Sequence, residues 1–265
     1  YLWMLIEYES NIVIIGGTGS GKTSFLNSIA FFMPPQARIV SIEDTHELNL
    51  LHTNWLPSVS RESTGVGGES KLGEVSLFTL LKASFRQRPD YVIVGEVRGE
   101  EAFVLFQGAA SGHPTICTMH AEDVETMIRR LETPPINLPP SLVETLDAVC
   151  VMTQTRIQGK EVRRLKNITE IMKVGTKVGS LDKNMPFSWD PQTDKFLFKK
   201  ESFIFKKLKE QFGMTEAQIR KDFERRTLLL WELYKRKIFG YKEVHQIISA
   251  YYKTPEEVLR RFNIK

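Results

Sequence analysis

The stretch Asn11-Ile12-Val13-Ile14-Ile15-Gly16-Gly17-Thr18-Gly19-Ser20-Gly21-Lys22-Thr23 decides the fold of this chain. Residues 11–15 are mostly β-branched and predict a buried strand. Residues 16–23 match the pattern G-x-x-x-x-G-K-[ST] in full, which places a phosphate-binding loop between a strand and a helix. Small residues let backbone N–H groups turn inward around phosphates, and the helix N-terminus adds its dipole. We expect Lys22 to contact the β- and γ-phosphates and the Thr23 hydroxyl to bind Mg²⁺.

Short apolar runs alternate with helical patterns along the first half of the chain. The strands are nearly all apolar rather than alternating, as in a parallel sheet that is covered on both faces. The pattern predicts an α/β fold with a mainly parallel sheet. Residues 51–74 are rich in Gly and Ser and are expected to form a long surface loop. The expected strands are 11–15, 38–42, 91–94, 115–119 and 148–152, and the expected helices are 22–32, 77–86, 100–110 and 124–131.

The pattern changes after Gln154. Residues 160–174 alternate as a strand or hairpin does, and residues 173–195 are turn-rich. From Ser202 on the sequence becomes helical. We therefore expect two parts, with a core over residues 1–155 and a small α/β-to-helical subdomain over residues 156–265.

Two helix starts in the second part carry the capping-box pattern. Thr215-Glu216-Ala217-Gln218 predicts a long helix that reaches Phe239, and Thr254-Pro255-Glu256-Glu257 predicts another. At the other end of the chain, Tyr1 to Ile6 has the pattern of the end of a helix without a start signal. We expect the chain to be the C-terminal piece of a longer protein.

Composition narrows the class of protein. The 265 residues carry a net charge of +4, which gives no reason to expect nucleic acid as the partner. Cys117 and Cys150 are the two cysteines, so neither a disulfide framework nor a four-cysteine zinc site is expected. The sequence has no apolar run of about 18 residues. We expect a cytoplasmic protein that meets the membrane through partners.

Acidic residues follow two of the expected strands. The strand from Tyr91 ends at Gly95-Glu96, where many phosphate-loop proteins carry Asp, so Glu96 is the candidate to hold Mg²⁺ through water or to polarise the attacking water. Glu43, Asp44 and Glu47 follow the second strand, at the sheet edge where α/β proteins bind ligands. One of them is expected to act as a general base.

Two histidines flank the strand expected at 115–119. His113 precedes the strand and His120 follows it. A histidine at the carboxyl edge could sense the γ-phosphate by hydrogen bonding, although a single histidine is more often structural.

These motifs, in this order, resemble the secretion ATPase superfamily, which comprises type II secretion, type IV pilus and type IV secretion ATPases, with the archaeal archaellum and pilus motors nearest. Residues 41–48 resemble the family's Asp box, residues 88–102 its atypical Walker B motif, and residues 112–121 its His box. The resemblance covers roughly residues 1–155. It implies a RecA-like P-loop core that binds ATP and Mg²⁺, and it implies that the family's N-terminal domain is absent here. The bacterial type II zinc module is absent as well.

The resemblance also implies roles for particular residues. Glu47 matches the catalytic base, Glu96 supports Mg²⁺ and water, and His120 couples nucleotide to neighbouring loops. Glu43 joins the nucleotide-binding set. Arg86 and Arg98 match positions where the family carries arginines near the phosphates, which act in the same chain or from the next subunit. Arg61 is a weaker candidate.

A motor ATPase of this kind would form a homo-hexamer at the cytoplasmic face of the membrane. It would drive filament assembly, filament rotation or secretion through a polytopic membrane platform protein. Two alternatives stay open at this point. One is a RecA-type DNA motor or helicase, and the other is a nucleotide-binding scaffold fragment without turnover.

Overall fold

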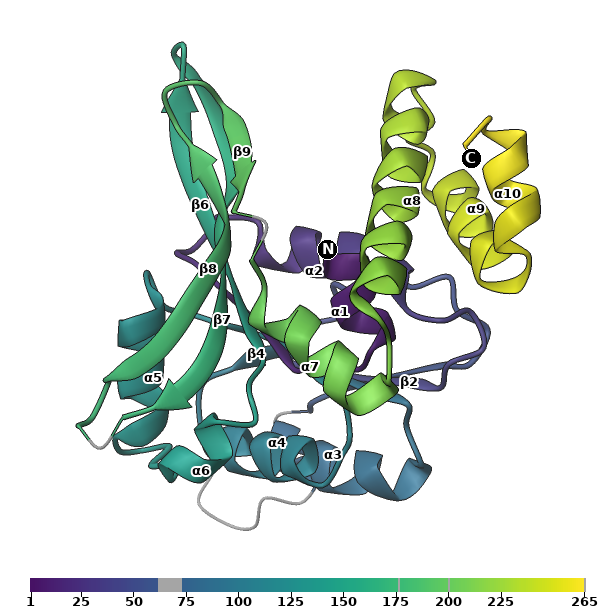
Figure 1. Cartoon of the computed structure of the whole chain (residues 1–265). Helices are drawn as coiled ribbons and strands as arrows, with labels where there is room; N and C mark the ends of the chain where they lie inside the picture. Colours follow the sequence, from purple (N-terminus) through teal and green to yellow (C-terminus); the bar gives the residue numbers. More distant parts are fainter. Residues whose placement is uncertain (62–72, 176, 200, 265) are drawn as a thin grey trace.

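The computed structural model describes residues 1–61, 73–175, 177–199 and 201–264. Within these ranges the strands form one nine-stranded sheet in the order β3-β2-β4-β5-β1-β6-β7-β8-β9 (Figure 1). The strands from β3 to β6 in this order are parallel, and those from β6 to β9 are antiparallel. The strands are β1 (Ile12–Ile15), β2 (Ile39–Glu43), β3 (Trp55–Val59), β4 (Tyr91–Val97), β5 (Thr115–Met119), β6 (Ala148–Ile157), β7 (Lys160–Val174), β8 (Leu181–Asp190) and β9 (Lys195–Phe198).

Helices lie on both faces of the parallel part. They include every helix expected from the sequence, with two of them ending in a 3₁₀ turn. The helices are α1 (Leu2–Glu7), α2 (Lys22–Ile29), α3 (Leu77–Ser84), α4 (Glu101–Ala110), α5 (Val124–Glu132), α6 (Pro140–Val143), α7 (Phe203–Phe212), α8 (Glu216–Lys235), α9 (Tyr241–Lys253) and α10 (Pro255–Arg261), with 3₁₀ turns η1 (Ala30–Phe32) and η2 (Phe85–Gln87).

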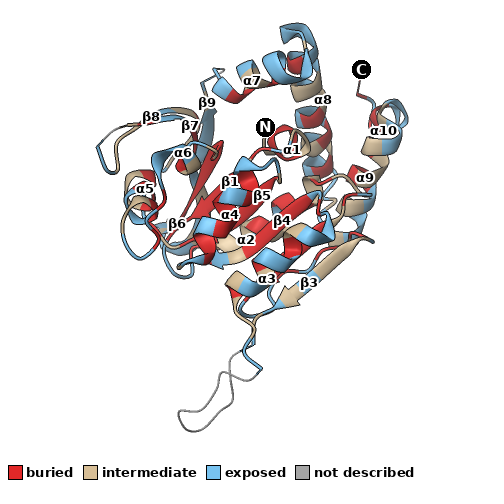
Figure 2. Cartoon of the chain, turned by 90° about the horizontal axis from the view of Figure 1, so that it is seen from below, coloured by how far each residue is buried: buried red, intermediate tan, exposed pale blue. Residues whose placement is uncertain are grey.

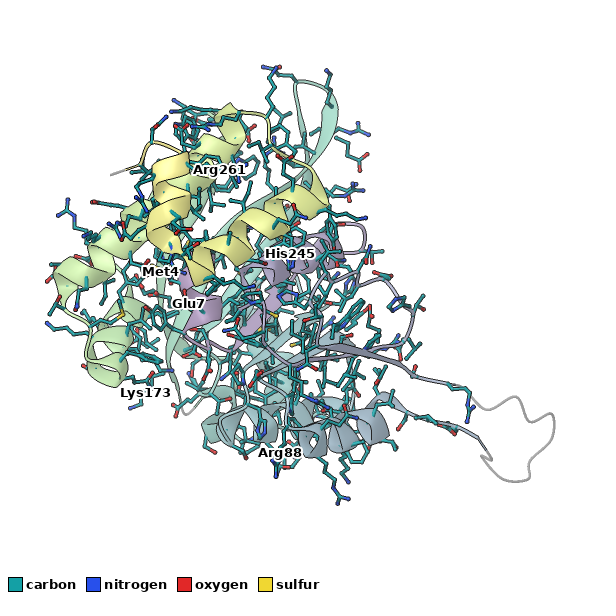
Figure 3. All side chains as sticks on the ribbon, turned by 90° about the vertical axis from the view of Figure 1, so that its right-hand side faces the viewer. Met4, Glu7, Arg88, Lys173, His245 and Arg261 are labelled. Atoms are coloured by element: carbon teal, nitrogen blue, oxygen red, sulfur yellow. The ribbon has the colours of Figure 1, made fainter. Side chains whose placement is uncertain are left out.

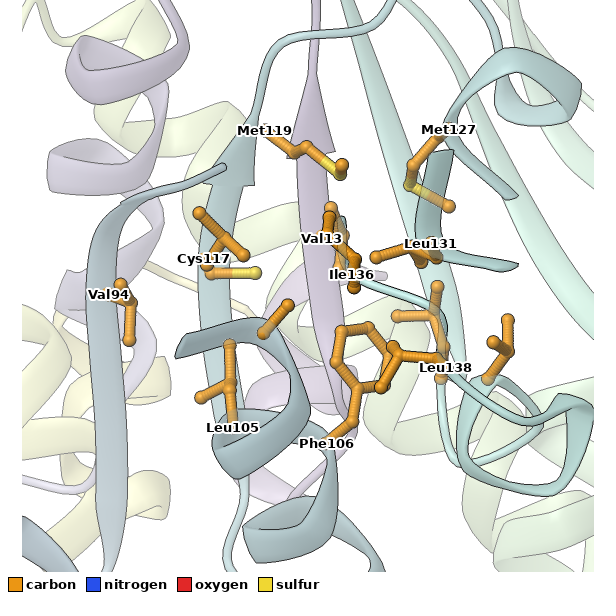
Figure 4. Close-up of a cluster of buried hydrophobic side chains, with 14 of the residues drawn as sticks. Val13, Val94, Leu105, Phe106, Cys117, Met119, Met127, Leu131, Ile136 and Leu138 are labelled. Carbon is orange, nitrogen blue, oxygen red and sulfur yellow. The ribbon is translucent and has the colours of Figure 1, made fainter. Parts of the chain in front are cut away.

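The alternation of side chains in each strand builds two hydrophobic cores. Val13 of β1 packs with side chains of α4 and α5, including Leu105 and Leu131 (Figure 4). Its neighbours Ile12 and Ile14 point the other way, into the core that contains α1, α2 and α7. Figure 2 shows the buried central strands behind α3 and α4. All four residues of β1 are therefore buried, as the apolar run predicted.

Two strands lie where the sequence indicated loops. β3 falls in the expected loop 51–74, whose residues 62–72 lie outside the described part. It is an edge strand beside β2 and contains Pro57, which an edge position tolerates because one side of the strand needs no ladder partner. β8 falls in the expected turn-rich segment 173–195 and is only partly buried, so it lacks an apolar signal.

Both predicted helix starts are confirmed, at Thr215 and at Thr254, but the capping box forms only at the first. The Thr215 hydroxyl and the Gln218 side chain form both bonds of the capping box, which confirms the first start. α8 ends at Lys235 rather than Phe239, since Lys237 adopts a left-handed φ of 55°. The second capping box was wrong, because the Thr254 hydroxyl donates to the Ala250 carbonyl of the preceding helix at 3.4 Å.

The C-terminal helices pack against the N-terminal helix. Trp3 of α1 lies in a third apolar cluster with Leu229, Ile248 and other residues of α8–α10. Arg226 of α8 forms an ion pair with Glu7 of α1, and Figure 3 labels Glu7. Within the described ranges, none of the helices combines the length and apolar character that crossing a membrane requires.

The expected division at residue 155 stays a prediction. β6 runs through this position, and its partner β7 is one continuous strand over the segment that was expected to be a strand or hairpin. The sheet therefore continues from the core into the C-terminal part, with a register shift between Val151 and Met152 and regular pairing on both sides of position 155.

A buried carboxylate fastens α7 to the sheet. Glu170 of β7 is fully buried and accepts hydrogen bonds from the Ser202 hydroxyl at 2.5 Å, Asn184 Nδ2 at 2.7 Å and the Phe203 amide at 2.8 Å. These bonds hold the first turn of α7 on β7 and β8.

Glu170→Ala is expected to lower the free energy of unfolding by about 2–4 kcal/mol, because it leaves several donors without an acceptor. Urea denaturation followed by circular dichroism measures this change. Glu161→Ala, at an exposed position of the same strand, serves as the control. Equal stability of the two variants would contradict the assigned role of Glu170.

Candidate functional site

The phosphate loop, residues 16–21, joins β1 to α2. Gly16, Gly19 and Gly21 have φ values of 156°, 73° and 89°, which favour glycine. A Cβ at Gly16 would lie 2.5 Å from Ser20 Oγ and 2.6 Å from the Met152 carbonyl oxygen. The loop therefore passes so close to β6 that Gly16 admits no side chain.

Lys22 is the first residue of α2, and its side chain folds back over the loop. Its ammonium donates to the carbonyls of Gly16 and Gly17, each at 3.1 Å, and lies 3.4 Å from His120 Nδ1. Burial lowers the pKa of Lys22, while the carboxylates of Glu96 and Glu47 oppose that shift. A partly desolvated cation therefore lies over the loop, and two carboxylates interact with it electrostatically.

The acidic segment after β2 is held in place by Glu43. This side chain is buried, and its Oε1 accepts from the amides of Glu47 at 3.0 Å and Leu48 at 2.9 Å. Asn27 of α2 donates to the Glu47 carbonyl at 3.3 Å and accepts from the Asn49 amide at 2.9 Å. The backbone of Glu47 is therefore bonded both to β2 and to α2, and its side chain is exposed.

Gly95 lies inside β4, two residues before the strand ends at Val97, and it packs close to Glu43. A Cβ at Gly95 would lie 3.1 Å from Glu43 Cγ, closer than a comfortable contact. The Gly95 carbonyl accepts from the Thr118 hydroxyl of β5 at 2.6 Å. The next residue, Glu96, is exposed and faces the same cavity as Lys22.

His120 follows β5 and touches the phosphate loop. Its Nε2 lies 3.2 Å from the Thr18 hydroxyl, and the Arg130 guanidinium of α5 donates to its backbone carbonyl. The histidine therefore links the end of β5 to the loop, in addition to its contact with Lys22.

Arg98 reaches the cavity from the segment after β4. Its guanidinium forms an ion pair with Asp44. Its amide donates to the buried carboxylate of Glu101 at 2.7 Å, which fixes the turn before α4. This pair joins the segment after β4 to the acidic segment after β2.

These side chains surround one open cavity of about 660 Å³ at the carboxyl edge of the parallel sheet, a volume typical of small-molecule sites. The predicted residues that line it are Thr18, Gly19, Gly21, Lys22, Thr23, Glu43, Asp44, Glu47, Glu96, Arg98 and His120.

Three predicted candidates lie elsewhere. Arg86 is in η2, before the amino end of β4, at the edge opposite the cavity, so the structure does not bring it to the phosphates of its own chain. His113 precedes β5 and packs against Phe85 at a ring distance of 5.0 Å. Arg61 donates to the Gly73 carbonyl at 2.6 Å, away from the residues that line the cavity.

Two further residues act at the site without a sequence signal. Asn27 looks like an ordinary polar residue of α2, and Arg163 is one of several basic residues in the strand β7. Arg163 lines the cavity and donates from Nε to the Gly19 carbonyl at 2.7 Å. Only the folded arrangement of β7 over the loop reveals it.

The residues fit a nucleoside triphosphate with Mg²⁺. The glycine loop, which has no room for a Cβ at Gly16, forms a backbone cradle for phosphates. Thr23 supplies a hydroxyl to the same cavity as the carboxylate of Glu96, and Mg²⁺ prefers such oxygen ligands together with substrate phosphates.

Comparison with known proteins agrees with this geometry. The family model of type II/IV secretion system proteins matches residues 1–183. The chain belongs to this family. Its RecA-like P-loop core is also found in the VirB11 ATPase of the Brucella suis type IV secretion system, solved in complex with sulphate, with a TM-score of 0.52 and 27% identity over 63% of this chain and 50% of that one.

Other secretion-family relatives include an archaeal protein. An uncharacterized protein of Methanocaldococcus jannaschii is 42% identical over 255 residues, which cover 93% of both chains. The type IV secretion system protein PtlH of Bordetella pertussis is 33% identical over 180 residues, or 63% of this chain and 52% of PtlH. The chain thus spans nearly all of one relative and about half of others.

The close approach of the loop to β6 gives a direct test. Gly16→Ala is expected to destabilise the fold by about 2–4 kcal/mol, because its Cβ overlaps Ser20 and Met152. Gly17→Ala is the matched control, since a Cβ there meets nothing within 4 Å. Thermal unfolding of both variants measures the difference. A similar loss of stability in the two variants would show that the loop does not pack on β6 in this way.

Proposed function

We propose that this secretion-family chain hydrolyses ATP in the cavity at its phosphate loop. The observation that carries the proposal is the placement of Glu47 and Glu96 in one cavity with Lys22. A cation that binds phosphate and carboxylates that can activate water then lie on the same side of the sheet. Either feature alone would suit simple binding, whereas the two together suit phosphoryl transfer to water.

In this proposal each side chain has a distinct task. Lys22 exchanges its two carbonyl partners for β- and γ-phosphate oxygens. Thr23 and Glu96 would hold Mg²⁺, which would supply positive charge to neutralise the phosphates. Glu47 orients a water molecule and accepts its proton. His120, through Thr18 and Lys22, links the phosphates to β5.

Glu43 acts through Glu47 rather than on the nucleotide itself. Both bonds from its Oε1 go to the backbone of the acidic segment, so it is a positioning residue. Arg98 has a carboxylate partner, Asp44, in the described structure. Its proposed action on the developing γ-phosphate charge requires that this exposed pair separate, which is inexpensive for a surface ion pair.

The proposed biological role is that of a motor for secretion or for a pilus-like filament. The support is membership of a family whose relatives are named for type IV secretion. We propose that the chain works as a homo-hexamer beside a polytopic membrane platform protein at the cytoplasmic face. In such a ring Arg86, which does not reach its own cavity, is available to a neighbouring subunit. The mass of the chain in solution with MgATP tests the assembly.

Glu47→Gln is expected to lower ATP turnover by about 10²–10⁴-fold, because the amide cannot accept the proton of the attacking water. Affinity for ATP should change little, since the amide is nearly isosteric with the carboxyl group. Turnover is measured by phosphate release and affinity by titration calorimetry. Glu122→Gln, which alters an exposed carboxylate outside the cavity lining, is the control.

Equal turnover of wild type and Glu47→Gln would remove Glu47 as the base. Tight ATP binding by the wild type without any phosphate release above background would favour the scaffold without turnover. In that case the site would still be a nucleotide site, and only the hydrolytic part of the proposal would fail.

A further inference from the structure

Two side chains of the antiparallel pair β6–β7 lie across the phosphate loop. Gln154 and Arg163 are directly opposite each other in the register, so both side chains emerge on one face of the sheet. A Cβ at Gly19 would lie 3.1 Å from Gln154 Oε1, and a Cβ at Gly21 would lie 3.0 Å from Arg163 Cδ. The two side chains therefore pack against the loop at Gly19 and Gly21.

Arg163 is anchored at one end of its guanidinium. Nε donates to the Gly19 carbonyl at 2.7 Å, and within the described residues this is the hydrogen bond that its side chain makes. Guanidinium has five N–H donors in a planar fork. The terminal nitrogens therefore retain donors, and the side chain lines the same cavity as Lys22.

The neighbouring Arg164 differs from Arg163 because a carboxylate binds its guanidinium. Arg164 points to the other face of β7, where its Nε and one terminal nitrogen each bind a carboxylate oxygen of Asp194 at 2.9 Å. Its charge is neutralised. Arg163 instead meets a neutral carbonyl, and no carboxylate in the described part of the chain forms an ion pair with it. A cation without a counter-ion beside a phosphate loop suits an anionic ligand.

We propose that Arg163 is a nucleotide-binding residue, in which Nε stays anchored on Gly19 and the terminal nitrogens donate to the phosphates held by the loop. Gln154 packs on Gly19 and limits the positions that Arg163 can adopt. The inference rests on the proposed nucleotide site and adds to it a cation from the C-terminal part of the chain. The phosphates would then be held between the loop and β7.

The test compares Arg163→Gln, Arg163→Lys and Arg164→Gln with the wild type. The dissociation constants of MgATP and MgADP are measured by titration calorimetry, and that of inorganic tripolyphosphate by competition. Arg163→Gln is expected to weaken all three ligands by about 10–100-fold, as loss of a charge-assisted contact does. The dissociation constants of Arg163→Lys should lie between those of the wild type and of Arg163→Gln, because lysine keeps the positive charge but lacks the planar set of guanidinium donors. Arg164→Gln should bind like the wild type.

The melting temperature without nucleotide distinguishes a role of Arg163 in ligand binding from a role in stabilising the loop. A lower melting temperature of Arg163→Gln with unchanged affinities would make Arg163 a structural clip and overturn the proposal. Weaker ATP binding with unchanged tripolyphosphate binding would overturn it too, since the contact would then be to the nucleoside. If the wild type binds none of the ligands, the proposed function itself fails, and this inference fails with it.

Discussion

The contact between the phosphate loop and β6 is the constraint on which the rest of the site depends. Gly16 approaches the Met152 carbonyl so closely that no Cβ fits between them. This contact sets where the loop turns, and hence where α2 begins and where the Lys22 ammonium lies. The position of the site therefore depends on the sheet, because β6, a strand distant in the sequence, packs against the loop.

A second set of contacts fixes the acidic side chains around that loop. Buried Glu43 holds the backbone of Glu47, and its side chain leaves little room for a Cβ at Gly95 of β4. Asn27 connects the same segment to α2. Because these bonds tie the acidic segment to β2 and to the loop's helix, the carboxylates of the site keep a defined position relative to Lys22 without contacting it.

The sequence predicted those parts of the site that depend on local pattern. The phosphate loop, the buried strands around it and the acidic segment after β2 each combine residue type with position, so their meeting at one sheet edge followed from parallel pairing. Strand β3 was missed because Pro57 interrupts its short apolar run, as an edge strand tolerates. Arg163 was missed because its role comes from the pairing of β7 with β6, which no spacing in the sequence shows. The resemblance matched Arg86 to arginines that act near the phosphates in the same chain or from the next subunit, and the structure places it in η2, outside the lining of its own cavity.

Mg²⁺-dependent ATP hydrolysis, measured over a range of protein concentrations with the molecular mass determined in the same samples, tests the account most directly. The account predicts phosphate release that requires Mg²⁺. The rate per subunit should rise as hexamers form, because in the proposed ring the arginines of a neighbouring subunit would reach the cavity. Hexamers that bind ATP and Mg²⁺ but release no phosphate above background would contradict it.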